Sequence, residues 1–239
     1  MYLESASAFS DRALERARAL VVGVGALGCA AASALAEAGI GHLTVVDDDR
    51  VEASNLQRQI LFDERSIGSA KAEAAAARLA EVAPRSRVAG RVARVDESNV
   101  DREIDAHDVV IDGTDDPRTK YLLNRAAVRA RVPLIYGGVV RTGGLAMAID
   151  GGRSACLACA FPETAAGAEL GCDRLGILAP VAGVIGSLQG YLAIALLGGD
   201  RAAPGTLFAY ELRGPRWRRF RFSRSRTCAA CGAAAASAA

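Results

Sequence analysis

Short apolar runs alternate with segments of helical composition through the first 138 residues of the chain. The apolar runs predict buried strands at residues 19–24, 42–47, 88–95, 108–112 and 133–136. Helical composition lies between or before them, at residues 10–18, 25–38, 71–82 and 117–130. Strands that alternate with helices are typical of a parallel sheet covered on both faces. The sequence therefore predicts a doubly wound α/β fold with a Rossmann-like, mostly parallel sheet.

The pattern changes after residue 138. Residues 139–150 predict a β-hairpin that turns around Gly143-Gly144, and two more strands are predicted at 206–212 and 216–222. The apolar run at 181–197 contains Gly, Ser and Gln, and it falls short of the ~20 apolar residues that span a bilayer. We therefore interpret it as a buried core helix and expect no association with a membrane.

Charge along the chain is nearly balanced, with 29 Lys and Arg against 27 Asp and Glu and a net charge of +2. Proteins that bind nucleic acid or anionic membranes typically carry a strong basic excess. The nearly balanced charge of this chain therefore argues against a nucleic-acid partner. The first 18 residues are polar and charged, unlike the apolar core of a signal peptide. We expect a cytoplasmic protein.

A glycine-rich loop follows the first predicted strand. Gly23-Val-Gly25-Ala-Leu-Gly28 fits the pattern G-x-G-x-x-G and leads into a predicted helix. Glycines there allow a tight turn and close approach of the backbone to phosphate, and the helix N-terminus favours negative charge. Asp47 ends the next strand, where a carboxylate accepts ribose hydroxyls. The loop predicts nucleotide binding, but it leaves open ATP, NAD or a glycine turn without ligand.

The segment at residues 47–59, Asp-Asp-Asp-Arg-Val-Glu-Ala-Ser-Asn-Leu-Gln-Arg-Gln, resembles the hallmark of the ThiF/MoeB/HesA branch of ubiquitin-activating-type enzymes. The resemblance extends from about residue 19 to residue 231. It implies ATP-dependent adenylation of the C-terminal carboxylate of a ubiquitin-like sulfur-carrier protein that ends in Gly-Gly. Such carriers supply sulfur in thiamine or molybdopterin-type cofactor biosynthesis. The polar cluster disfavours an NAD-dependent oxidoreductase.

Two cations are candidates for contact with the triphosphate as pyrophosphate leaves. Arg58 lies in the hallmark segment, and a guanidinium forks onto phosphate oxygens. Gly68-Ser-Ala-Lys71 resembles the family's Gly-x-x-Lys, which implies that Lys71 touches the phosphates. The alternatives are a solvated loop residue for Arg58 and, for Lys71, an ion pair with an acid one turn away.

A second acidic motif follows the strand at 108–112. Asp112-Gly-Thr-Asp115 resembles the family's Asp-x-Thr-Asp, which implies that Asp115 holds Mg²⁺ and takes part in adenylation. We interpret Asp112 and Thr114 as mainly structural. Asn55 matches a family position near the nucleotide, with a solvated loop residue as the alternative.

Two Cys-x-x-Cys pairs, formed by Cys156, Cys159, Cys228 and Cys231, make a candidate zinc site. Each pair offers two thiolates on one tight turn, and two turns complete a tetrahedron around Zn²⁺. A closed Cys₄ site stabilises rather than catalyses, so the zinc would tie a small C-terminal extension to the body of the domain. A pair of redox motifs is the alternative.

The two remaining cysteines differ in context. Cys172 begins a segment, 172–189, that resembles a family loop near the adenylate. The resemblance implies attack on the acyl-adenylate or sulfur transfer in some relatives and no chemical role in others, and both readings stay open for Cys172. Arg174 is positioned in sequence to lower the thiol pKa. Cys29, within the first long helix, is interpreted as a small packed residue.

The expected organisation is an N-terminal arm at 1–18, an adenylation domain at 19–232 and an Ala-rich tail at 233–239. The domain divides into a nucleotide half at about 19–138 and a cysteine-bearing, crossover-loop part at about 139–232. We expect a homodimer and a separate sulfur donor. Relatives usually begin with Arg-Tyr-x-Arg-Gln, whose arginine enters the partner subunit's ATP site. Here Arg12 or Arg16 replaces it, or adenylation is weaker.

Other functions remain open at this stage. Within the family, the acceptor is alternatively a peptide terminus or a modified tRNA base, and the even charge argues against the tRNA. An adaptor that binds nucleotide without adenylating anything is a further alternative, favoured by the unusual N-terminus.

Overall fold

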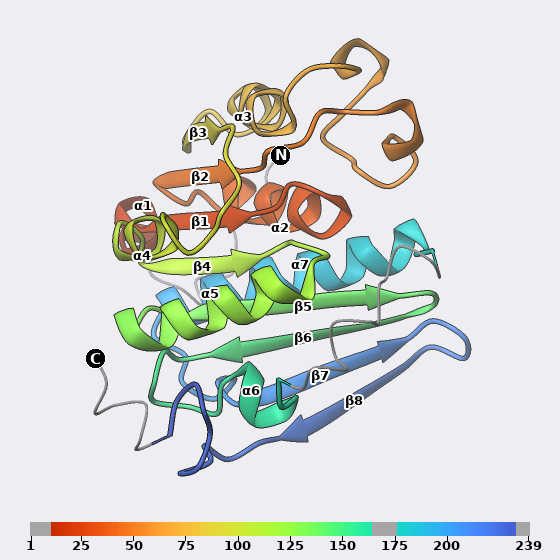
Figure 1. Ribbon diagram of the computed structural model, residues 1–239. Coiled ribbons are helices and arrows are strands. Elements are labelled where there is room, and N and C mark those ends of the chain that lie inside the picture. Colours follow the sequence, from red (N-terminus) through yellow and green to blue (C-terminus); the bar gives the residue numbers. More distant parts are fainter. Residues whose placement is uncertain (1–10, 164–175, 233–239) are drawn as a thin grey trace.

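A computed structural model of the chain describes residues 11–163 and 176–232, and a single β-sheet runs through it (Figure 1). Its strands are β1 (Arg18–Val22), β2 (His42–Val46), β3 (Arg87–Arg91), β4 (Val109–Asp112), β5 (Leu134–Val140), β6 (Gly143–Ile149), β7 (Thr206–Glu211) and β8 (Arg216–Arg221). Within the described residues the strand order is β3-β2-β1-β4-β5-β6-β7-β8. The strands from β3 to β5 pair in parallel, and β6, β7 and β8 extend the sheet antiparallel. The predicted α/β fold class is confirmed.

Helices cover both faces of this sheet. They are α1 (Asp11–Arg16), α2 (Ala26–Glu37), α3 (Lys71–Val82), α4 (Val100–Asp105), α5 (Pro117–Ala130), α6 (Leu157–Ala160) and α7 (Ala179–Leu197), with 3₁₀ turns at Ala53–Asn55 and Glu64–Ser66. Because side chains alternate along a strand, Ala19 and Val21 face the core under α2, α3 and α7. Leu20 and Val22 face the second core, under α4, α5 and α6. In Figure 1, α5 lies in front of the sheet and α7 behind it.

Helix α7 packs closely against α2. A Cβ atom added at Gly186 would lie 2.5 Å from the carbonyl oxygen of Leu27, and one at Gly190 would lie 2.6 Å from the Cβ of Ala34. Glycine at these positions lets the two helices approach. Among the described residues α7 is the helix long and apolar enough to cross a membrane, and 56% of that stretch is buried inside the fold. The structure places it in the core, as predicted for residues 181–197.

The hairpin after residue 138 turns at a different place from the one predicted. β5 and β6 pair from Leu134 with Ile149 to Val140 with Gly143, so the turn is formed by Arg141 and Thr142. The prediction of a turn at Gly143-Gly144 is therefore wrong. Gly144 lies within β6, where a Cβ would come 2.4 Å from the side chain of Ile185 on α7. The glycine serves helix-on-sheet packing.

Two further differences concern the nucleotide half. β3 ends at Arg91, four residues before the predicted end at 95. A turn follows at 97–99, where the carboxylate of Asp96 accepts hydrogen bonds from Ser98. Helix α4 was not predicted, because its sequence is short and mostly charged. Its Glu103 is nevertheless buried, and it pairs with Arg91 at 2.5 Å.

Candidate functional site

The candidate site is a pocket of about 760 Å³ at the carboxyl ends of the parallel strands. β1 is flanked by β2 on one side and β4 on the other, so the chain connections leave the sheet in opposite directions at this point. Ligands of open α/β sheets bind at this kind of switch point. The pocket is lined by residues from the glycine loop, the loop after β2, the hallmark segment, the start of α3 and the loop after β4.

The glycines of the loop have different roles. Gly23 has a φ of +83°, and a Cβ at Gly28 would lie 1.9 Å from the carbonyl oxygen of Gly23, so α2 packs directly on the end of β1. Gly113 completes this contact, since its Cβ would lie 2.4 Å from the same oxygen. Gly25 differs, because its nearest neighbour would be 3.9 Å away. It precedes α2 without a side-chain cap, which leaves first-turn N–H groups for an anion.

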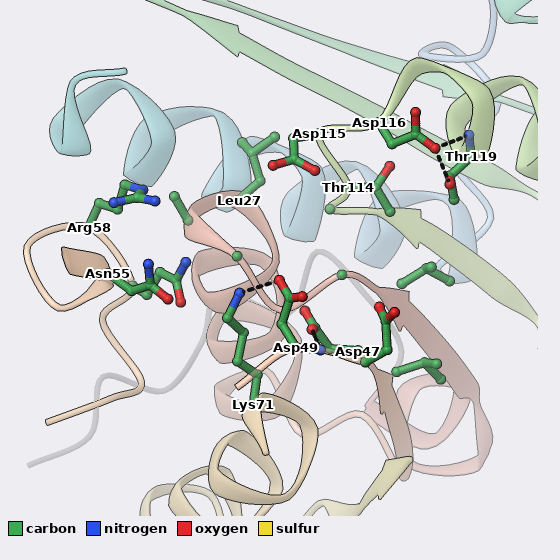
Figure 2. Close-up of a pocket in the computed structure, with 18 of the residues that line it drawn as sticks. Leu27, Asp47, Asp49, Asn55, Arg58, Lys71, Thr114, Asp115, Asp116 and Thr119 are labelled. Atoms are coloured by element: carbon green, nitrogen blue, oxygen red, sulfur yellow. Dashed lines mark hydrogen bonds and ion pairs between the residues drawn. The ribbon is translucent and has the colours of Figure 1, made fainter. Parts of the chain in front are cut away.

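Asp47 is oriented by backbone donors. Its carboxylate accepts hydrogen bonds from the N–H of Val24 at 2.7 Å and of Asp49 at 2.8 Å. Burial raises the pKa of Asp47, and these two hydrogen bonds act in the opposite direction. The glycine loop thus helps to fix this carboxylate, which lies at the pocket wall (Figure 2).

Lys71 is paired in the pocket, but its partner is not an acid one turn away. Its Nζ lies 2.7 Å from the carboxylate of Asp49, in the loop after β2. A bridge between Arg50 and Ala70 brings the two segments together. The lysine is 7% exposed, whereas the side chain of Asp49 is 67% exposed. An ammonium has three donors, one of which is directed to Asp49.

Asn55 and Arg58 lie on the same side of the pocket as Lys71, opposite Asp115 (Figure 2). Asn55 is buried, and its side-chain oxygen accepts from the N–H of Glu52 at 3.3 Å, which closes a capping box around the 3₁₀ turn. Arg58 donates to the carbonyl oxygen of Ser54 at 2.8 Å. Local hydrogen bonds therefore hold both side chains at the pocket wall.

Asp115 is exposed in the loop after β4 and borders the pocket. Its neighbour Asp116 is committed to the start of α5, where it accepts from the N–H groups of Arg118 and Thr119. Partial burial raises the pKa of Asp116, but hydrogen bonds from Thr119 and Arg118 outweigh it, and the pKa lies below its usual value. Both acids line the pocket, but Asp116 also caps α5.

A second cavity of about 750 Å³ adjoins the first. The two share Asp115, Lys120, Gly138 and Val139. The lining of the second cavity is mostly apolar and aromatic, with a charged rim, and includes Tyr121, Tyr136, Leu145, Leu157, Phe161, Phe220, Glu211, Arg216 and Arg218. We call it the apolar groove. Sequence patterns gave no sign of it, because its residues come from separate strands and helices.

The four cysteines predicted to bind zinc lie together. Their Sγ atoms are all within 4.8 Å of one another. Cys156 is 3.9 Å from Cys159 and 3.7 Å from Cys228, and Cys159 is 3.4 Å from Cys231. A tetrahedral Zn²⁺ with Zn–S bonds of about 2.3 Å separates its sulfurs by about 3.8 Å. The cluster is therefore compatible with structural zinc.

The other two cysteines are separate from this cluster. Cys29 is fully buried and its thiol donates to the carbonyl oxygen of Val24 at 3.4 Å. Burial raises the pKa of the Cys29 thiol to about 12, so it is protonated at neutral pH. It is a packed residue, as predicted. Cys172 and Arg174 lie outside the described residues.

Comparisons with known proteins show what this chain is similar to. The ThiF family model matches residues 3–231. The chain is 37% identical to the molybdopterin-synthase adenylyltransferase of Escherichia coli strain K12, over 93% of the chain and 90% of that protein. It is 35% identical to the sulfur carrier protein ThiS adenylyltransferase of the same strain, over 89% and 85%. A crystal structure of E. coli MccB with MccA-N7isoASN shares the fold, with a TM-score of 0.82 and 23% identity over 93% of this chain and 69% of that one.

Proposed function

The chain belongs to the ThiF family, and we propose that it is an adenylyltransferase that activates the C-terminal carboxylate of a ubiquitin-like sulfur-carrier protein with ATP. The observation that carries this proposal is that two cavities of different chemistry meet at Asp115. One lies under a glycine loop and is lined by charged residues, and the other is apolar. The first suits a nucleotide and the second suits a peptide segment.

ATP occupies the first pocket in this proposal. Asp47 accepts the ribose hydroxyls, as carboxylates at this position do, and the N–H groups at the start of α2 face the phosphates. Arg58 and Lys71 supply positive charge to the triphosphate, with Asn55 beside them. Their placement around one pocket supports these roles.

Asp115 is the residue that we assign to Mg²⁺, with the carboxylates near the glycine loop as further oxygen donors. Hard cations take carboxylate and phosphate oxygens, so the donor set fits. When bound, the ion neutralises charge on the phosphates. The remaining chemistry belongs to the chain, which holds the triphosphate between Arg58 and Lys71.

In the proposed reaction, a carboxylate oxygen of the acceptor attacks the α-phosphorus of ATP. A bond forms between this oxygen and the α-phosphorus, and the bond between the α-phosphorus and the oxygen that bridges to the β-phosphorus breaks, with its electron pair leaving on pyrophosphate. The product is an acyl-adenylate. Fixed cations stabilise charge that builds up on the leaving group, which lowers the barrier.

The apolar groove receives the C-terminal segment of the acceptor. Its lining includes Gly138, and a Cβ there would lie 2.8 Å from the hydroxyl of Tyr136, so Tyr136 leaves no room for a side chain at this point. A tail that ends in Gly-Gly fits such a passage, because glycine adds no side chain. The groove opens onto Asp115, where the carboxylate would meet the α-phosphate.

Several finer points are part of the proposal. We infer a homodimer, structural zinc at the four cysteines and a cytoplasmic location. The pathway is sulfur transfer for thiamine or molybdopterin-type cofactors, with a separate sulfur donor. Cys172 is the candidate for a later thiolate or persulfide step. The relatives' names support adenylation of sulfur carriers and leave the acceptor of this chain open.

Gly25→Ala is expected to weaken ATP binding about tenfold, because the new methyl group would occupy space next to the phosphates without a clash with other protein atoms. The free energy of unfolding should change by less than about 1 kcal/mol. Titration calorimetry and thermal melting measure the two effects. Gly183→Ala, at an open position within α7, is the control and should leave ATP binding intact. Equal ATP affinity in both variants would contradict a phosphate site at Gly25.

Arg58→Ala is expected to reduce carrier-dependent ATP–pyrophosphate exchange ten- to a hundredfold, since it removes a fixed cation from the triphosphate. The assay uses purified carriers that end in Gly-Gly, each with and without the terminal glycine. Arg65→Ala, an exposed arginine on the neighbouring 3₁₀ turn, is the control. Binding of ATP without exchange for any carrier would favour a different acceptor or a nucleotide-binding adaptor.

A further inference from the structure

Lys120 is a buried lysine at the point where the nucleotide pocket and the apolar groove meet. Its Nζ donates to the two carboxylate oxygens of Asp112, at 3.3 and 3.1 Å. It also donates to the carbonyl oxygens of Thr114 at 2.6 Å and Gly137 at 2.7 Å. An ammonium has three protons, and these four acceptors engage them. Lys120 is therefore equipped to hold protein groups together.

The groups that Lys120 holds belong to different parts of the site. Asp112 ends β4 and is fully buried, and Thr114 immediately precedes Asp115. Gly137 lies in β5 next to Gly138, which lines both cavities. The lysine thus connects the loop that carries Asp115 to the strand beneath both cavities.

The end of β4 is also held from the opposite face of the sheet. The side-chain amide of Gln189, on α7, donates to the backbone carbonyl oxygens of Asp112 at 2.8 Å and Ile135 at 3.1 Å. A Cβ at Gly137 would lie 2.4 Å from this amide, so a larger residue there would have to displace it from its hydrogen bonds. With Lys120 on one face and Gln189 on the other, the strand end has little freedom to shift.

We propose that Lys120 is a positioning residue for adenylation, which fixes the loop of residues 113–115, and with it the Asp115 carboxylate, relative to the floor shared by both cavities. The catalytic consequence rests on the proposed function, because it requires Asp115 to act in adenylation. The loop restraint itself does not. Displacement of a reacting group by about 1 Å costs up to a hundredfold in rate, so such a restraint affects turnover without contact with the substrate.

A purely structural ion pair is the alternative, and a double variant separates it from positioning. Lys120→Met alone leaves the Asp112 carboxylate buried without its cation, which is strongly destabilising. Asp112→Asn/Lys120→Met removes both charges at similar volume, and such replacements are often neutral for stability. The double variant still lacks the hydrogen bonds from residue 120 to the carbonyl oxygens of Thr114 and Gly137. It is therefore expected to fold stably and to lose the restraint.

The test measures hydrogen exchange of residues 112–118, melting temperature and the kinetics of carrier-dependent pyrophosphate exchange in the full chain. For the double variant we expect a melting temperature within about 4 °C of wild type and about tenfold faster amide exchange in this loop. The kcat should fall about ten- to a hundredfold, with the KM for ATP within about twofold. Lys120→Arg, which keeps a cation with several donors, should recover part of the kcat.

His107→Gln is the control for a general loss of stability. His107 is buried and bonded to Thr44 and Glu103, away from both cavities. A stable double variant whose loop shows the same amide hydrogen exchange as wild type would overturn the proposal. Faster hydrogen exchange in the loop of the double variant with an unchanged kcat would overturn it as well. If wild type itself shows no ATP–pyrophosphate exchange with any carrier, the proposed function fails. Hydrogen exchange in the loop then still decides whether Lys120 positions it.

Discussion

Asp115→Asn is expected to lower the kcat of carrier-dependent ATP–pyrophosphate exchange by about 10²–10³, the largest effect on activity that we expect from a single substitution. Removal of one group that stabilises transition-state charge typically costs this much. The substitution keeps the shape of the side chain and removes the negative charge. Because Asp115 is exposed, the melting temperature should change little. Initial rates over a range of Mg²⁺ concentrations measure the effect, and higher Mg²⁺ should recover part of the rate.

The adjacent acid provides a matched control. Asp116 accepts hydrogen bonds from N–H groups at the start of α5, and asparagine caps helices about as well as aspartate. Asp116→Asn is therefore expected to keep the kcat within about threefold of wild type and to cost less than about 1 kcal/mol of stability. Equal losses in the two variants would show that general charge near the pocket matters, and would refute a specific role for Asp115.

The parts of the site that could be predicted from the sequence depend on local patterns. The glycine loop and Asp47 were predictable because a strand, a turn and a helix follow each other directly, and the structure places both at one pocket. The parallel strands were predictable because each is a local run of apolar residues. The predicted sheet covered on both faces agrees with the two cores of the structure, since buried strands such as β1 contribute to both of them.

The parts that were missed depend on contacts between distant segments. Lys120 lies on a helix among polar residues and reads as a surface lysine, although Asp112 and Gly137 bury it in the fold. The partner of Lys71 is Asp49, 22 positions away, and no helical spacing indicates it. Gly144 reads as a turn glycine because the side chain that requires it, Ile185, lies on a later helix. Tertiary packing decides all three cases.

The four-cysteine cluster connects the C-terminal extension to the wall of the apolar groove. Cys156 is the N-cap of α6 and Cys159 lies within it, and Leu157 of this helix lines the groove together with Phe161. Cys228 and Cys231 come from the segment after β8. Cys228 neighbours Cys156 and Cys231 neighbours Cys159, and in each pair the two residues are 72 positions apart in the sequence. Loss of the metal should therefore loosen one wall of the groove and leave the nucleotide pocket, which α6 does not line, largely unchanged.

Cys228→Ser/Cys231→Ser is expected to abolish zinc binding and to lower the melting temperature by about 10 °C or more, the largest effect on stability that we expect. A closed Cys₄ site contributes directly to folding, and about 4 kcal/mol corresponds to such a shift in a chain of this size. Metal analysis should find about one zinc per wild-type chain and almost none in the variant. Below its melting range, the variant should show a higher KM for the carrier and an unchanged Kd for ATP. Cys29→Ala, which removes a buried cysteine outside the cluster, should keep the zinc. Wild-type protein without zinc, or a variant as stable as wild type, would contradict a structural metal.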